Sequence, residues 1–224
     1  MDPQNITDKK RAQYIEKNPC WNIHNEIGYI AFFGMVKDMQ EKLGRPLRIV
    51  ELGTKRWNEN GPPTHHKKDF ENSGINVSSY LLTDYINGMD VDIIADIHTF
   101  TKIFPTESID VIYSGATYEH IKYPWLASHE LLKSLKIGGL IYIMTVHTFP
   151  LHGFPSDYYR FSRAALENLF TTEMGAIIIN SWYDYLNNII DEGIGHGYAE
   201  SYSNVDLIVR KQKSTPLTWI YNFD

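Results

Sequence analysis

Three carboxylates stand at the ends of short apolar runs that read as strands. Glu51 lies near the end of the run RIVEL and precedes Gly53, Asp84 ends a second run, and Asp96 ends a third. In an open α/β sheet, ligands bind beyond the carboxyl ends of the strands, where a glycine lets the backbone approach the ligand closely. Carboxylates in this position suit a ligand that is cationic or rich in hydroxyl and amine donors. They would repel a bare pyrophosphate, which argues against a dinucleotide.

A second set of side chains follows the fourth and fifth predicted strands and can accept a proton. The candidate bases are Glu119, His120, His147, His152 and Asp157, of which His120 and His152 are favoured. A base whose pKa lies near neutrality helps any reaction in which a hydroxyl loses its proton. Each of these histidines also fits an ordinary hydrogen-bonded loop position.

The segment after the second histidine reads as a substrate-side wall, formed by Asp157, Tyr158 and Arg160. Aromatic faces stack on sugar or ring surfaces, and arginine binds carboxylate or phosphate. The neighbouring Tyr159 and Phe161 equally fit the packing of a returning segment.

Seven apolar runs must position these residues. The predicted strands are Arg48–Leu52, Ser79–Thr83, Val91–Ala95, Ile109–Tyr113, Leu140–Val146, Ala176–Ser181 and Val205–Val209. Helical patterns at Trp125–Leu135 and Arg163–Leu169 interleave with them, which predicts a largely parallel sheet covered on both faces. A polar loop at Asp184–Asn204 separates the last two strands, and we expect these to pair antiparallel at one edge.

Two helices are expected before the first strand. A polar amphipathic helix is predicted over residues 7–18, and a second helix runs from about Asn22 to Leu43, where Gly44 suits the C′ position. We therefore predict an N-terminal helical extension at residues 1–46, acting as a lid or interface, and one α/β domain at residues 47–224.

Composition excludes several classes of function. The 224 residues carry a formal net charge of −6, which argues against broad binding to nucleic acid or to an anionic membrane. No apolar run approaches the roughly 20 residues needed to span a bilayer. Cys20 is the only cysteine, and the polar start MDPQNITDKK lacks the apolar core of a signal peptide. These features predict a cytoplasmic protein from a reducing compartment.

Three segments carry a resemblance to a known family: GMDVDIIADIH at 88–98, DVIYSGATYEHIKYPWLASHELLKSLKIGGLIYI at 110–143, and HGFPSDYYRFS at 152–162. Over roughly residues 47–210 the chain resembles a class I S-adenosylmethionine-dependent methyltransferase, of a bacterial type with a divergent first motif. The resemblance implies a Rossmann-like, seven-stranded, mostly parallel sheet with helices on both faces. It implies a methyl transfer enzyme whose acceptor is a small molecule, most simply an oxygen of a sugar or related metabolite.

The resemblance also implies which residues bind S-adenosylmethionine: Glu51, Gly53, Thr54, Asp84, Tyr85, Asp96, Ile97 and Ser114. Glu51 and Gly53 would lie against the methionine part, and Asp84 would hold the ribose. Asp96 and Ile97 would contact the adenine, and Ser114 would line the site at the end of the fourth strand. His120 and His152 are the predicted catalytic bases. No metal site is assigned, and homo-oligomerisation is left open.

One departure from the family keeps an alternative open. Family members carry two further glycines after the first, where this chain has Lys55 and Trp57, and the loop Trp57–Lys68 replaces a tight turn into a long helix. Glycines in such loops allow positive φ and close backbone approach. The alternative is therefore a non-catalytic protein of the same fold that binds the cofactor or a partner.

Four other patterns favour different chemistry less strongly. Tyr118 and Lys122 have the Tyr-x-x-x-Lys spacing of short-chain dehydrogenases, but Thr54–Trp57 provides no glycine-rich turn for a pyrophosphate. The glycine-rich Gly193–Gly197 lacks a strand–helix frame and reads as a turn or lid. His65 and His66, on a proline-rich loop, read as solvent-exposed. His147, His152 and Asp157 have suitable metal-ligand types but follow no fixed spacing rule.

Overall fold

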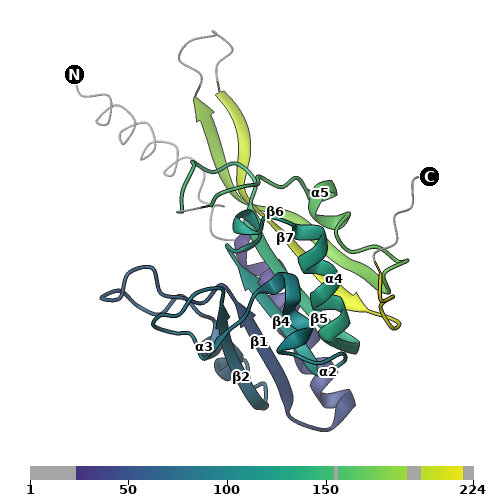
Figure 1. The fold of residues 1–224 in the computed structure, drawn as a ribbon. Helices are drawn as coiled ribbons and strands as arrows, with labels where there is room; N and C mark the ends of the chain where they lie inside the picture. The colour runs from purple at the N-terminus through teal and green to yellow at the C-terminus, as the bar shows by residue number, and fades with distance from the viewer. Residues whose placement is uncertain (1–23, 154–155, 191–197, 219–224) are drawn as a thin grey trace.

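A seven-stranded sheet forms the centre of the molecule (Figure 1). The computed structural model describes residues 24–153, 156–190 and 198–218, so the helix predicted at 7–18, Cys20 and Gly193–Gly197 lie outside the described residues. The strand order is β3-β2-β1-β4-β5-β7-β6. The strands are β1 (Leu47–Leu52), β2 (Val77–Asp84), β3 (Ile93–Ile94), β4 (Ile109–Gly115), β5 (Leu135–Val146), β6 (Ala176–Ile190) and β7 (Tyr198–Lys211).

The pairing confirms the predicted, mostly parallel sheet. β1 pairs in parallel with β2 and with β4, β2 pairs in parallel with β3, and β4 with β5. β7 lies antiparallel between β5 and β6, so the last two strands form the expected antiparallel edge. Since β1 to β5 run in one direction, their carboxyl ends meet at one edge of the sheet. The order along the chain reverses between β1 and β4, which makes the crevice beside these two strands the expected ligand position.

Helices cover both faces of the sheet (Figure 1). α2 (His24–Leu43) and α3 (Lys67–Asn72) cover one face, and α4 (Pro124–Ser134) and α5 (Arg163–Glu167) cover the other. α2 shares a hydrophobic cluster with β1, β4 and β5, so it covers a face of the sheet directly. It ends at Gly44, which has a φ of +61° and donates its N–H to the carbonyl of Gln40 at 2.9 Å. The boundary drawn at residue 46 stays a prediction.

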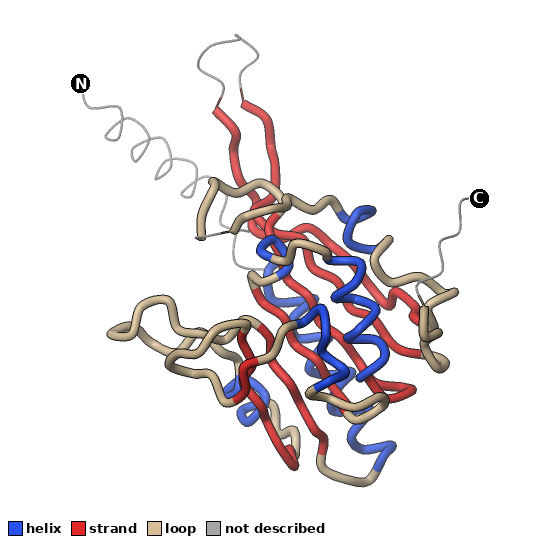
Figure 2. The backbone as a smooth tube through the Cα atoms, viewed as in Figure 1, coloured by secondary structure: helices blue, strands red, loops and turns tan. Residues whose placement is uncertain are grey.

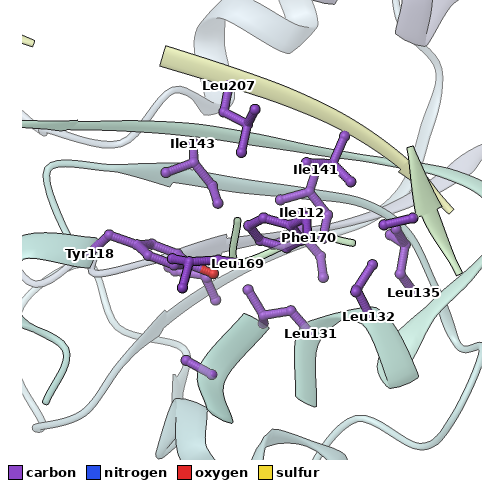
Figure 3. Packing of buried hydrophobic residues seen from close by; sticks show 14 of the residues in the cluster. Ile112, Tyr118, Leu131, Leu132, Leu135, Ile141, Ile143, Leu169, Phe170 and Leu207 are labelled. Atoms are coloured by element: carbon purple, nitrogen blue, oxygen red, sulfur yellow. The ribbon is translucent and has the colours of Figure 1, made fainter. Parts of the chain in front are cut away.

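The two hydrophobic clusters follow from the alternation of side chains along each strand. Ile112, Ile141 and Leu207 face α4, whereas Val111 and Tyr142 face α2. Figure 3 shows the α4 side, where the side chains of Leu131 and Leu132 belong to one hydrophobic cluster with Ile112, Ile141 and Leu207. The same alternation decides the direction of polar residues at the strand ends. Glu51 therefore faces the α2 side, and Ser114 the α4 side.

The edge hairpin corrects one expectation. The polar stretch Asp184–Asn204 was predicted as a loop, but β6 and β7 continue through most of it and remain paired out to Ile190 and Tyr198. The two strands project beyond the rest of the sheet as a long ribbon (Figure 2). Pairing of two exposed strands along one ribbon satisfies their backbone groups without an apolar pattern, so side-chain periodicity did not reveal it. A smaller correction concerns the loop Trp57–Lys68, where α3 begins at Lys67.

Among the described residues, the helices are too short or too polar to cross a membrane.

Candidate functional site

Gly53 sets the close approach between the end of β1 and the end of β4. It has a φ of +69°, and a Cβ built on it would lie 2.2 Å from Thr117 Oγ1. The Thr117 hydroxyl in turn donates to the carbonyl oxygens of Leu52 at 3.3 Å and Gly115 at 2.9 Å. Ala116, which lies between Gly115 and Thr117 in the chain, has a φ of +48°, an uncommon conformation for a residue with a side chain. The ends of β1 and β4, where the strand order reverses, are thus held close together by the contact between Gly53 and Thr117.

Asp84 connects the loops that follow β1 and β2. Its carboxylate accepts the backbone N–H of Lys55 at 3.0 Å and that of Ile86 at 3.1 Å. Each carboxylate oxygen keeps a second lone pair, so a diol can still donate to it. Tyr85 follows with 73% of its surface exposed, where it can cover a ligand.

Asp96 was predicted to end the third strand, but β3 ends at Ile94, and Asp96 instead caps the 3₁₀ helix Ile97–Lys102 that follows. Its carboxylate accepts the His98 N–H at 2.9 Å and contacts His98 Nδ1 at 2.8 Å. Burial alone would raise the pKa of Asp96, but these His98 hydrogen bonds outweigh it, and the pKa lies below its usual value. The carboxylate is therefore charged near neutral pH and remains partly exposed.

Glu51 is satisfied inside the protein. It is 3% exposed and accepts the His66 backbone N–H at 3.0–3.1 Å, the Tyr80 hydroxyl at 2.5 Å, and contacts His66 Nδ1 at 2.9 Å. His66 is thus tied to the strand, which corrects the interpretation of His65 and His66 as solvent-exposed. These contacts make Glu51 an anchor for the end of the loop after β1. Direct contact of Glu51 with a ligand stays a prediction.

The loop after β1, residues 53–66, is called the β1 loop below. Side-chain contacts hold this loop at the positions where the family carries glycines. Arg56 forms a two-pronged ion pair with Asp90, at 2.7 Å from Nε and 3.1 Å from Nη2, and also donates to the Gly61 carbonyl at 2.9 Å. The Thr54 hydroxyl donates to the Asp90 carbonyl at 2.6 Å.

The two residues that replace glycines have separate positions. Lys55 gives its N–H to Asp84 and packs its side chain over Gly88, whereas Trp57 is 85% exposed. The β1 loop is therefore held by hydrogen bonds and an ion pair instead of by glycine turns. Sequence reasoning missed Arg56 and Asp90, because nothing in their spacing marks them as partners.

Ser114 is fully buried at the end of β4, and its hydroxyl has no hydrogen-bond partner among the described residues. Buried hydroxyls are ordinarily paired, so the unpaired Ser114 hydroxyl is unusual. Gly53, Thr54, Asp84 and Ser114 lie at the carboxyl ends of β1, β2 and β4, and their contact with a cofactor stays a prediction.

A second polar cluster lies beyond β4 and β5, built from Glu119, His120 and His152, and it is called the Glu–His cluster below. Glu119 is fully buried, and its Oε2 accepts the Thr145 hydroxyl at 2.7 Å. Its Oε1 has no hydrogen-bond partner in the described part of the chain and lies 3.6 Å from His152 Nε2 and 3.9 Å from His120 Nε2. Both rings are about one-third exposed, so this cluster is open to solvent on one side.

The backbone sets the tautomer of both rings. His120 Nδ1 lies 2.6 Å from the Ser156 carbonyl oxygen, and His152 Nδ1 lies 3.1 Å from the Pro150 carbonyl oxygen. A carbonyl oxygen only accepts, so each Nδ1 carries a proton, and in its neutral form each ring keeps a lone pair on Nε2. Two basic nitrogens and one carboxylate oxygen thus converge, which the sequence predicted for the histidines individually but not as a cluster.

Gly153 lets the loop that carries His152 approach His120. Its φ is +73°, and a Cβ there would lie 2.6 Å from His120 Cε1. The glycine directly after His152 is the one signal in the sequence that could have indicated this approach.

Arg160 and Asp157 clamp the same loop. The guanidinium binds both oxygens of Asp157, at 2.6 and 2.7 Å, and donates to the carbonyls of Phe149 and Pro150 at 2.9 Å each. Asp157 also accepts the His152 N–H at 2.8 Å, and the Arg160 hydrogen bonds hold the pKa of Asp157 well below its usual value. These contacts position His152. The hydrogen-bond donors of Arg160 are used within the protein. Tyr158 beside it is 47% exposed and available to a ligand.

Two alternative chemistries lose their support. Tyr118 is fully buried with its hydroxyl 3.0 Å from Ser128 Oγ, and burial raises its pKa, so it is a core residue and not a proton donor. His147 Nδ1 lies 2.7 Å from the Phe161 carbonyl, and its ring packs on Tyr183, so it stands outside the Glu–His cluster. Among the described residues, His147, His152 and Asp157 therefore do not form a metal-binding group, in keeping with the low weight given to this set from the sequence.

Comparison with known proteins agrees with the fold described above. Residues 70–143 match the family model described as a methyltransferase domain. No curated protein matches the sequence.

Solved structures share the fold at low sequence identity. A Burkholderia thailandensis 1,6-didemethyltoxoflavin-N1-methyltransferase, solved with 1,6-didemethyltoxoflavin and S-adenosylhomocysteine, is 11% identical with a TM-score of 0.51, covering 95% of this chain and 92% of that one. The YcgJ protein from Bacillus subtilis is 10% identical with a TM-score of 0.50, over 81% and 99%. The CurJ carbon methyltransferase is 14% identical with a TM-score of 0.50, over 78% and 51%. The family match over residues 70–143, together with the sheet and its strand order, gives the chain the fold of the class I methyltransferases.

Proposed function

We propose that the protein transfers a methyl group from S-adenosylmethionine to an oxygen of a small-molecule acceptor, a sugar or related metabolite. The residues beside β1, β2 and β4 fit the cofactor. Gly53 gives the end of β1 a backbone without a side chain, and the buried Ser114 hydroxyl lacks a hydrogen-bond partner among the described residues. When bound, S-adenosylmethionine supplies an electrophilic methyl group on a sulfonium sulfur.

Each cofactor-binding residue has a proposed part. Asp84 would accept hydrogen bonds from the ribose hydroxyls through the lone pairs that Lys55 and Ile86 leave free. Asp96 would accept from the adenine amine, with Ile97 and Tyr85 packing on its ring. The fixed charge of these carboxylates favours a cationic ligand over an anionic one.

The observation that carries the acceptor chemistry is the convergence of the Nε2 atoms of His120 and His152 on Glu119 Oε1. In a methyl transfer the acceptor oxygen would bond to the methyl carbon, and sulfur would keep the electron pair of the broken carbon–sulfur bond. One neutral Nε2 would take the hydroxyl proton. The Glu119 carboxylate, within 3.6–3.9 Å of both, then stabilises the imidazolium. Holding the acceptor in line supplies much of the rate.

The acceptor class rests on the wall around this cluster. Tyr158, whose N–H donates to the Glu119 carbonyl, is half-exposed, and the partly exposed Phe149 lies against His152 with ring centroids 5.0 Å apart. Aromatic faces stack on sugar rings, whereas the Arg160 guanidinium is committed to Asp157. A neutral, hydroxyl-bearing acceptor is therefore favoured over an anionic one. A cytoplasmic location stays a prediction.

The test is release of S-adenosylhomocysteine across a panel of sugars and small hydroxylated metabolites. Wild type should turn over at least one acceptor, and His120→Ala or His152→Ala should lower kcat at least tenfold, the lower range for a lost proton acceptor. His147→Ala is the matched control, because His147 follows β5, as His152 does, but lies outside the Glu–His cluster. Cofactor binding without turnover of any acceptor would instead support the non-catalytic alternative. Full activity in both variants would remove the two histidines from the mechanism.

A further inference from the structure

We propose that Glu119, His120 and His152 bind a divalent transition-metal ion. The three ligand atoms, Glu119 Oε1 and the two Nε2 atoms, all lie within 4.8 Å of one another. Ligands with bonds of about 2.0–2.2 Å to a shared ion lie about 3–4 Å apart. The distances of 3.6 Å and 3.9 Å from Oε1 to the two nitrogens match this range.

The three ligand atoms face one another without a hydrogen-bond donor between them. Both Nδ1 atoms donate to backbone carbonyls, so in the neutral rings both Nε2 atoms face Glu119 Oε1 as acceptors. Direct hydrogen bonds do not resolve this, since 3.6 Å and 3.9 Å exceed hydrogen-bond length. The fully buried Oε1 also lacks a partner among the described residues. A bound cation satisfies all three atoms at once.

Outer contacts hold the ligands as metal sites require. Ligating histidines ordinarily donate the other ring N–H to a carbonyl or carboxylate, which fixes ring orientation. Here the Ser156 and Pro150 carbonyls do so for His120 and His152, and the Thr145 hydroxyl holds the second oxygen of Glu119. Gly153 permits the close approach of the two rings, whose centroids lie 5.0 Å apart.

The donor set selects the ion. Imidazole nitrogens favour zinc, iron, nickel or copper over magnesium and calcium, which prefer all-oxygen sites. Two histidines and one glutamate supply three protein ligands, and the solvent-exposed sides of both rings leave coordination positions open.

The chemical part played by the ion rests on the proposed function. With the ion bound, the two imidazoles are ligands and no longer bases. An acceptor hydroxyl on an open position would lose its proton to water more readily, because a bound cation lowers its pKa.

Ion binding is measured without activity. The full chain is stripped with a chelator and titrated with Zn²⁺ by calorimetry, with Mg²⁺ as the contrasting ion. We expect one equivalent of Zn²⁺ with micromolar or tighter affinity and no saturable Mg²⁺ binding. The affinity for Zn²⁺ should fall at least tenfold in each of the ligand variants His120→Ala, His152→Ala and Glu119→Gln. It should fall about tenfold in Thr145→Val. His147→Ala should leave this affinity unchanged. Circular dichroism of each variant confirms that it folds.

The overturning results are separate from those of the proposed function. No saturable Zn²⁺ binding at millimolar concentration, or equal loss in His147→Ala, would refute the metal site. As a second readout, Co²⁺ should give visible absorption bands typical of nitrogen and oxygen ligation, which Glu119→Gln alters; unchanged bands in that variant would also refute it. Methyl transfer by chelator-treated protein would leave the proposed function standing even if Zn²⁺ failed to bind.

Discussion

At the scale of single residues, Gly53 decides whether the ends of β1 and β4 can approach closely. An alanine there would hold a positive φ of +69° and place its Cβ 2.2 Å from Thr117 Oγ1. Gly74 shares the φ of +69° but has open space around its missing Cβ, so it isolates the backbone effect. We expect Gly74→Ala to cost about 1 kcal/mol of unfolding free energy and Gly53→Ala about 3 kcal/mol or more.

Chemical denaturation measures these differences. Adding Thr117→Ala to Gly53→Ala should restore part of the loss, because it removes the two nearest atoms of the clash. Equal costs for both single glycine variants would show that the contact with Thr117 is unimportant.

Several site residues were predictable one by one because strand ends in a parallel sheet meet at one edge. Asp84 lies where the apolar run placed it, and Gly53 has the positive φ that glycine favours. The convergence of Glu119, His120 and His152 was not predictable, since it depends on how one loop returns over another. The internal pairing of Arg160 was missed for the same reason.

At the scale of elements, Glu51 links the β1 loop to the sheet. Its carboxylate accepts both from the His66 backbone and from the Tyr80 hydroxyl on β2. Glu51→Gln turns one acceptor into a donor facing these groups, which should cost about 1–3 kcal/mol. We expect faster amide hydrogen exchange across residues 54–66 and weaker cofactor binding.

Tyr80→Phe is the matched variant, because it removes one hydrogen bond and keeps both His66 contacts. Mass-spectrometric exchange should rank its effect on the β1 loop below that of Glu51→Gln. Unchanged exchange in this loop for Glu51→Gln would contradict the anchoring role.

The elements themselves were largely predictable from periodicity. The apolar runs gave all seven strands, and the predicted helices at Trp125–Leu135 and Arg163–Leu169 correspond to α4 and α5. Short α3 and the outer half of the β6–β7 hairpin carry no apolar stripe. Their formation depends on backbone pairing and on contacts made after the sheet has formed.

At the scale of the whole molecule, one buried carboxyl should shape stability against pH. Asp206 on β7 is 1% exposed, accepts the Tyr142 hydroxyl at 2.5 Å, and burial raises its pKa to about 7. Between pH 4 and 7 the folded state therefore keeps a proton that the unfolded state loses. The protonated Asp206 carboxyl contributes to the free energy of unfolding fully below pH 4, and this contribution is lost as the pH rises from 4 to 7.

Asp206→Asn removes this titration and keeps an acceptor for Tyr142. Its unfolding free energy should exceed that of wild type at pH 8, by on the order of 2–4 kcal/mol, and the difference should shrink toward pH 4. Urea unfolding at several pH values measures it. A difference that does not vary with pH would show that Asp206 is already charged in the folded state.

The most direct test of the account is calorimetric titration of the full chain with S-adenosylmethionine and with its demethylated product. We predict one site, and at least tenfold weaker binding in Asp84→Asn, because the ribose hydroxyls lose an acceptor. Asp92→Asn is the control, since Asp92 also accepts a backbone N–H, from Leu82 at 2.9 Å, but precedes its strand. Absence of binding at millimolar concentration, or equal affinities in wild type and Asp84→Asn, would contradict the cofactor site described at the ends of β1 and β2.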